Sequence, residues 1–270
     1  MKTAHAIRAM SAVVGREVRS FVRQPGRLFS ALVRPLLWLV VFAAGFQNVF
    51  GVAIAPPYET YIEYKVYVLP GLLGMAALFN GMQSSLAMVY DREMGLMRLL
   101  LTAPLPRAWI LASKMMAGAL LSFLQMLAFL VVSFFFGIDL QLSNILLALP
   151  VFLLAALMLS ALGLVLSVYV KQLENFAGTM NFVIFPMFFI STALYPLWKL
   201  EESGARVVHA LASVNPFTHA VEAIRFALYG QLLPSSLCIV AGCTGAFFCI
   251  ALWGYDPQRG VARRPAGGKP

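Results

Sequence analysis

The sequence predicts an all-α integral membrane protein, and two observations support this fold class. The first is composition: of the 270 residues, 61% are hydrophobic and only 11% are charged, and the mean hydropathy is +0.83. Soluble domains carry about 25% charged residues, so one soluble core could not bury this much apolar surface. The second is that the apolar residues group into six stretches, each long enough for the roughly 20 residues that a spanning helix needs.

The six predicted transmembrane helices occupy residues 28–50, 66–90, 109–137, 144–170, 176–197 and 235–254. They form one six-span domain over residues 28–254, and we expect residues 255–270 to be a flexible cytoplasmic tail. Arg34 lies near the start of the first span, where we expect its long side chain to reach the headgroups. Pro186 lies within the fifth span, so we expect that helix to kink or to end early.

The distribution of basic residues predicts the orientation in the membrane. Sixteen of the 20 Lys and Arg residues lie in segments that a six-span topology places on the same side as the two termini. Because Lys and Arg are enriched in cytoplasmic segments, both termini are expected in the cytoplasm. This topology also accounts for the net charge of +9. A nucleic-acid-binding protein would need a basic groove on a folded soluble domain, so no nucleic acid partner is expected.

Residues 1–27 are predicted to form a cytoplasmic amphipathic helix in the membrane interface. On a helical projection at about 100° per residue, Arg16, Arg19 and Arg23 share one side and a group of apolar side chains shares the other. This pattern is typical of a helix that turns its arginines toward anionic headgroups, so membrane lipids are an expected partner. Two roles stay open: a passive anchor that sets the orientation, and a lever that a cytosolic partner moves.

A charged segment, residues 91–108, interrupts the apolar sequence between the second and third spans. Residues 95–102 can form a short amphipathic helix, which Pro104 and Pro106 end. A plain connection between two helices needs only about 2–8 residues. A short amphipathic helix between two breakers is therefore interpreted as a docking element on the cytoplasmic face.

Residues 198–234 form a second segment with its own pattern, on the external side. Asn215 and Pro216 are typical of the start of a helix, and Gly230 is typical of its end. The helix between them is too short to cross the membrane, so we expect a re-entrant or interfacial pair of helices. Glu222 and Arg225 are spaced i, i+3, which predicts either an ion pair inside this external cap or a surface pair worth a few tenths of a kcal/mol.

Two segments of the chain resemble one family of membrane proteins. The segment DREMGLMRLLLTAPLPR, residues 91–107, with Lys114 beyond it, resembles the segment after the second span of type-2 ATP-binding-cassette (ABC-2 type) exporter permeases. The segment SVNPFTHAVEAIRFALYG, residues 213–230, resembles the stretch before their last span. The resemblance covers nearly the whole chain; Leu96 departs from it, because the family often has Thr there.

The resemblance implies that two permease subunits pair as a homodimer, with two copies of a cytosolic ATPase subunit beneath them. ATP and magnesium would bind to that ATPase, and no cofactor is expected in this chain, which contains no G-x-x-x-x-G-K-[ST] phosphate loop. Residues 93–104 would be the coupling helix, and the N-terminal helix would be the second contact. The resemblance assigns ATPase coupling to Asp91, Arg92, Glu93, Gly95, Arg98, Leu100 and Pro104.

Uncharged polar residues lie inside the predicted spans, whereas no ionisable residue is expected at a span centre. Proton- or ion-coupled transporters usually keep an ionisable group at membrane depth, so a secondary transporter is disfavoured. The polar residues either hydrogen-bond between helices or line a path for substrate, and both readings stay open. The residues that we single out for a translocation path are Asn80, Gln83, Gln125, Asn181 and Phe185.

These expectations favour the permease subunit of an ATP-driven exporter of a lipidic, glycan or drug-like substrate in a plasma membrane, by analogy a bacterial inner membrane. The alternatives are an integral membrane enzyme that modifies a lipid or a glycan, and an assembly factor. Such an enzyme would need a catalytic cluster of polar residues at the membrane surface. The sequence indicates no catalytic residue and no metal site, so a transport subunit rather than an enzyme is expected.

Overall fold

A computed structural model describes residues 8, 10–12, 14–16, 18–19, 23, 25–45, 56–58, 62–93, 106–170 and 172–255. Within these ranges the regular secondary structure is helical, which confirms the predicted all-α class. The helices are α2 (Pro25–Gly45), α3 (Tyr64–Glu93), α5 (Arg107–Phe134), α6 (Leu142–Tyr169), α7 (Leu173–Phe189), α8 (Leu197–Glu202), α9 (Arg206–Val214), α10 (Pro216–Leu228) and α11 (Pro234–Gly254).

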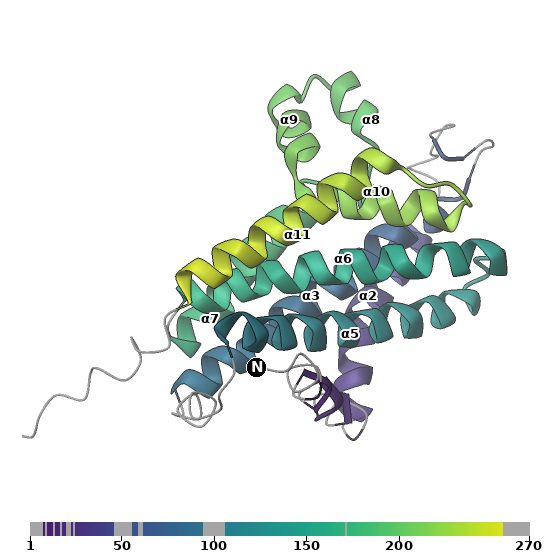
Figure 1. The fold of residues 1–270 in the computed structure, drawn as a ribbon. Helices are drawn as coiled ribbons and strands as arrows, with labels where there is room; N and C mark the ends of the chain where they lie inside the picture. The colour runs from purple at the N-terminus through teal and green to yellow at the C-terminus, as the bar shows by residue number, and fades with distance from the viewer. Residues whose placement is uncertain are drawn as a thin grey trace, which may run out of the picture.

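Helices α3 and α6 form the centre of the molecule, and the other long helices pack around them. Figure 1 shows α5, α6 and α11 running side by side, with the short helices α8 and α9 projecting away from the bundle. Helix α10 lies between α3, α6 and α11, and nine of its 13 residues are buried. The segment 198–234 is therefore folded into the bundle by α10, while α8 and α9 stay outside it.

Four helices are long and apolar enough to cross a membrane: Tyr64–Tyr90, Arg107–Phe134, Leu142–Tyr169 and Pro234–Gly254. They coincide with the second, third, fourth and sixth predicted spans. The first predicted span corresponds to α2, whose apolar part is Leu32–Val41, and the fifth corresponds to α7, which has 17 residues. The chain is therefore a multi-pass membrane protein, and the count of six spans stays a prediction.

The fifth predicted span, residues 176–197, is shorter in the structure. Helix α7 ends at Phe189, three residues after Pro186, and a non-helical segment follows until α8 begins at Leu197. At about 1.5 Å per residue, 17 residues extend about 26 Å, less than the roughly 30 Å of a hydrocarbon core. The early end that Pro186 led us to expect is thus present, and the predicted boundary at residue 197 is too late.

Helices α3 and α6 approach each other closely at two glycines. A Cβ atom at Gly81 would lie 3.0 Å from the backbone of Leu159, and one at Gly163 would lie 2.6 Å from the carbonyl oxygen of Gly81. Small residues let helix backbones approach in membranes, where van der Waals contact replaces the hydrophobic effect as the main attraction. This contact therefore sets the distance between the two central helices.

The N-terminal helix and the charged segment 91–108 are described only in part. Between Arg8 and Arg19 each described residue is helical, and the backbone amide of Arg23 donates to the carbonyl of Arg19 at 3.1 Å. Arg16, Arg19 and Arg23 are exposed, whereas the described apolar residues Met10, Val14 and Val18 are half-buried. This pattern agrees with an amphipathic helix, and its position in the membrane interface stays a prediction.

Candidate functional site

The start of α10 is fixed by Asn215, the residue that precedes it. The Oδ1 atom of Asn215 accepts a hydrogen bond from the backbone amide of Phe217 at 2.9 Å, and Pro216 occupies the first turn of the helix. An Asn cap followed by Pro is a favoured helix start, because the cap satisfies an amide that has no partner within the helix. At the other end Gly230 has φ +76°, which a glycine adopts without strain. The helix boundaries predicted from the sequence are confirmed.

The same Asn215 also joins α10 to the end of α7. Its Nδ2 atom donates to the carbonyl oxygens of Met187 at 2.8 Å and Ile190 at 2.6 Å. Carbonyls at the end of a helix have no partner within it, and at membrane depth each such group must find one in the protein. Asn215 therefore acts as a cap for two helices at once.

Replacing Asn215 with alanine is expected to lower the free energy of unfolding by about 2–3 kcal/mol, because one helix cap and two hydrogen bonds are lost together. The measurement is thermal unfolding of the purified full chain in detergent. Ser213→Ala is the matched control, because its exposed hydroxyl donates only to the carbonyl of Ala210 in the preceding turn. Equal stability of the two variants would contradict the double role of Asn215.

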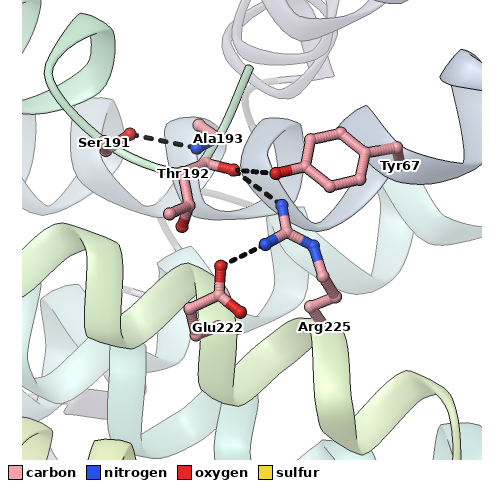
Figure 2. Close-up of polar contacts among 6 residues, drawn as sticks. All are labelled: Tyr67, Ser191, Thr192, Ala193, Glu222 and Arg225. Atoms are coloured by element: carbon pink, nitrogen blue, oxygen red, sulfur yellow. Dashed lines mark hydrogen bonds and ion pairs between the residues drawn. The ribbon is translucent and has the colours of Figure 1, made fainter. Parts of the chain in front are cut away.

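The centre of the candidate site is Arg225 on α10, which is only 1% exposed. Its Nη1 atom donates to Glu222 Oε1, and its Nη2 atom donates to the carbonyl oxygen of Thr192 at 2.7 Å (Figure 2). Its guanidinium carbon also lies 4.2 Å from the centre of the Tyr67 ring, a cation–π contact. The ion pair expected between Glu222 and Arg225 is thus present, and it is inside the protein rather than on a surface helix.

Two tyrosines of α3 hold the same non-helical segment after α7. The hydroxyl of Tyr67 donates to the Thr192 carbonyl at 3.1 Å (Figure 2). The hydroxyl of Tyr64 donates to the Leu194 carbonyl at 2.7 Å. Gly71 makes this approach possible, because a Cβ atom there would lie 2.6 Å from the carbonyl oxygen of Ala193. The Thr192 carbonyl therefore receives hydrogen bonds from both α3 and α10, and three segments meet at one atom.

Burial and neighbouring charges together set the electrostatics around this cluster. Burial lowers the pKa of Arg225, but the adjacent Glu222 carboxylate and the neighbouring tyrosines raise it, and the result lies above the usual range. Burial also raises the pKa of Tyr58 well above its usual value and that of Tyr229 to about 12. Arg225 is therefore charged and the two tyrosines are neutral at physiological pH. The arrangement can hold segments together, but it offers no group poised for proton transfer.

The residues singled out for a translocation path separate into two groups. Asn80 donates to Ser122 Oγ of α5 at 2.9 Å, Gln125 is buried, and Gln83 is half-buried, so these three lie among the packed helices. Asn181 and Phe185 instead lie one turn apart on the exposed side of α7. The structure therefore gives Asn80 an interhelical contact and leaves Asn181 and Phe185 on an open face of the bundle.

Arg34 is a residue that the sequence reasoning placed differently. Its guanidinium carbon lies 3.8 Å from the centre of the Phe79 ring, near the middle of α3, rather than at a helix end near the headgroups. Phe79 in turn contacts Phe185 of α7, with 6.3 Å between ring centres. The sequence shows only that one arginine lies within the apolar stretch Leu32–Val41. The position of its guanidinium along α3 depends on how α2 packs against α3.

The residues expected to couple to an ATPase are described only at one end. Asp91, Arg92 and Glu93 have helical backbone and extend α3 beyond the candidate span. Gly95, Arg98, Leu100 and Pro104 lie outside the described residues, which begin again at Pro106. The coupling role of this segment stays a prediction.

The fold and the site define a multi-pass membrane protein whose buried polar groups connect helices. The comparison with protein families then gives a narrower assignment, because residues 8–229 match the model of the ABC-2 type transporter. The chain belongs to this family and is a permease subunit of an ABC-2 type transporter. Members of the family work with an ATPase partner.

Relatives with curated names agree with this assignment. A transport permease of Cyanophora paradoxa, ycf38, is 32% identical over 238 residues, which cover 86% of this chain and 78% of the relative. The daunorubicin resistance ABC transporter permease protein DrrB1 of Streptomyces coeruleorubidus is 24% identical over 251 residues, 90% of this chain and 84% of the relative. The inner membrane transport permease YadH of Escherichia coli is 21% identical over 223 residues, 82% and 83% of the two chains.

Proposed function

We propose that this chain is the membrane subunit of an ATP-driven exporter that moves a lipidic, glycan or drug-like substrate across a bacterial inner membrane. In this proposal two copies of the chain pair, and two copies of a separate ATPase subunit bind at the cytoplasmic face and hold the ATP and magnesium. The single observation that carries the proposal is the family match over residues 8–229. The names of a drug-resistance permease and of an inner membrane permease among the relatives support the substrate class and the membrane.

The charged segment 91–108 is proposed as the contact that receives the motion of the ATPase. Helix α3 is continuous from Tyr64 to Glu93 and has a single proline inside it, Pro70, so a displacement at its cytoplasmic end can be carried along the 23 proline-free residues from Gly71 to Glu93. At its other end α3 contacts the Thr192 carbonyl through Tyr67. This continuity supports a mechanical path from the ATPase to the external cap.

The test is an affinity pull-down of the tagged full chain from native membranes in mild detergent, with co-purifying proteins identified by mass spectrometry. We expect an ATPase subunit to co-purify with wild type. Its recovery should fall about tenfold or more when Glu93→Ala is combined with Arg98→Ala, because charged contacts at an interface contribute about 1.5–3 kcal/mol to the binding free energy.

The matched control is Glu201→Ala combined with Arg206→Ala, which removes one acidic and one basic residue from the exposed helices α8 and α9. This control should retain the ATPase. Absence of any ATPase with wild type would contradict the proposed function, whereas equal recovery with both double variants would contradict only the assignment of the coupling segment.

A further inference from the structure

The charge of Arg34 lies beside the middle of a candidate membrane span. Its guanidinium rests on the Phe79 ring, and Phe79 is 15 residues after the first residue and 11 before the last of the candidate span Tyr64–Tyr90. At about 1.5 Å per residue, Phe79 is about 16 Å or more from either end of this span. The arginine is therefore well away from both ends of the helix that it contacts.

A second helix gives the same depth. Asn80, the neighbour of Phe79, donates to Ser122 Oγ at 2.9 Å. Ser122 lies 15 residues after Arg107 and 12 residues before Phe134, the two ends of the candidate span in α5. The level of Phe79 and Asn80 is thus near the middle of both α3 and α5, where a charged side chain is costly unless it has a partner.

No carboxylate among the described residues pairs with Arg34. Among the residues that the structure describes, Arg34 makes no hydrogen bond and no ion pair, and its guanidinium makes a cation–π contact with the Phe79 ring. All 11 acidic residues of the sequence lie outside the six predicted spans. A second copy of the same chain therefore has no mid-membrane carboxylate to offer either, and the counter-ion must come from another molecule.

The side chains around Arg34 include both a charged group that can bind a headgroup and apolar groups that can contact a hydrocarbon tail. Arg34 is exposed, and Phe185, which contacts Phe79, is exposed on α7 beside the amide of Asn181 one turn away. The apolar side chains of Leu37 and Phe189 are exposed on the same two helices. A guanidinium can bind two oxygens of one phosphate, and exposed aromatic and aliphatic side chains can contact hydrocarbon.

We propose that Arg34 binds the phosphate headgroup of an anionic amphiphile carried by the transporter, and that the Phe79 and Phe185 rings and the Asn181 amide contact the same ligand. This inference rests on the proposed transport function and names the substrate class. The negative charge of the ligand neutralises an arginine that has no counter-ion among the described residues. The transported molecule therefore carries both a phosphate and a hydrocarbon part.

The test is binding of short-chain phosphatidylglycerol to the purified, delipidated full chain, followed by native mass spectrometry, with short-chain phosphatidylcholine and inorganic phosphate in separate arms. Wild type should bind phosphatidylglycerol roughly tenfold or more tightly than phosphatidylcholine, as one charge-assisted contact predicts. Arg34→Gln should reduce that preference to about equal binding, and Arg34→Lys should retain part of it. Arg206→Gln, which removes an exposed arginine of α9, should bind as wild type does.

Three results would overturn the proposal. The first is equal binding of the two lipids by wild type, which requires no variant and so is independent of how Arg34→Gln folds. The second is an unchanged preference in a folded Arg34→Gln chain. The third is binding of inorganic phosphate as tight as that of phosphatidylglycerol, which would indicate a site for a free anion. Because no ATPase is present, these results are separate from the pull-down that tests the proposed function.

Discussion

Arg225→Met is expected to lower the free energy of unfolding by about 3 kcal/mol or more, because it leaves Glu222 without its partner inside the protein. The carbonyl of Thr192 also loses the donor on α10 and keeps only the hydrogen bond from Tyr67, so one of the contacts that hold the segment after α7 is lost. The measurement is thermal unfolding of the full chain in detergent. In native membranes the same variant is expected to lose transport activity in proportion to the fraction of protein in which α10 no longer packs against the segment after α7.

The contribution of the ion pair can be separated from that of the carbonyl contact. Glu222→Gln keeps Arg225 and its bond to Thr192, and it should cost less than Arg225→Met, since the Glu222 side chain is 19% exposed and the arginine side chain 2%. The variant that combines Glu222→Gln with Arg225→Met should lose less stability than the two single variants lose together, because the effects of substitutions at residues in direct contact do not add. Strictly additive losses of unfolding free energy would contradict a direct interaction between the two residues. The control for loss of an arginine is Arg206→Met, at the exposed start of α9.

Gly163→Leu is expected to destabilise the chain by about 3 kcal/mol or more, at the upper end of the cost of overpacking. The new side chain would begin 2.6 Å from the carbonyl oxygen of Gly81, so α3 and α6 would have to separate. Since α3 also carries Tyr67 and Phe79, this separation would disturb both the contacts of Arg225 and the surroundings of Arg34. The measurement is again thermal unfolding in detergent, together with the yield of folded protein from membranes.

The matched control for this variant is Gly242→Leu on α11. A Cβ atom at Gly242 would meet no other atom within 4 Å, and the helix is mostly exposed. Leucine has a higher helix propensity than glycine by up to about 1 kcal/mol, so Gly242→Leu should be neutral or slightly stabilising. A similar loss of stability in both variants would show that leucine is poorly tolerated in these helices in general, and that the α3–α6 contact has no special role.

Sequence reasoning was most successful where the signal is local. Asn215, Pro216 and Gly230 mark the ends of α10 by backbone chemistry that involves only a few neighbouring residues, and the structure has those boundaries. Four of the six predicted spans correspond to long apolar helices for the same reason, since hydropathy is summed over a single segment. The end of the fifth was predicted eight residues too late, because a proline indicates a break without fixing the residue at which the helix ends.

The sequence by itself determined that this protein is a multi-pass helical membrane protein of the ABC-2 type, because composition, apolar length and the two family segments are properties of continuous stretches of chain. Only the tertiary structure decided the environments of Arg225 and Arg34. Arg225 binds a carbonyl 33 residues away, and Arg34 rests on a ring 45 residues away. Such partners depend on how separate helices pack, and no periodicity within one helix encodes which neighbour it will meet.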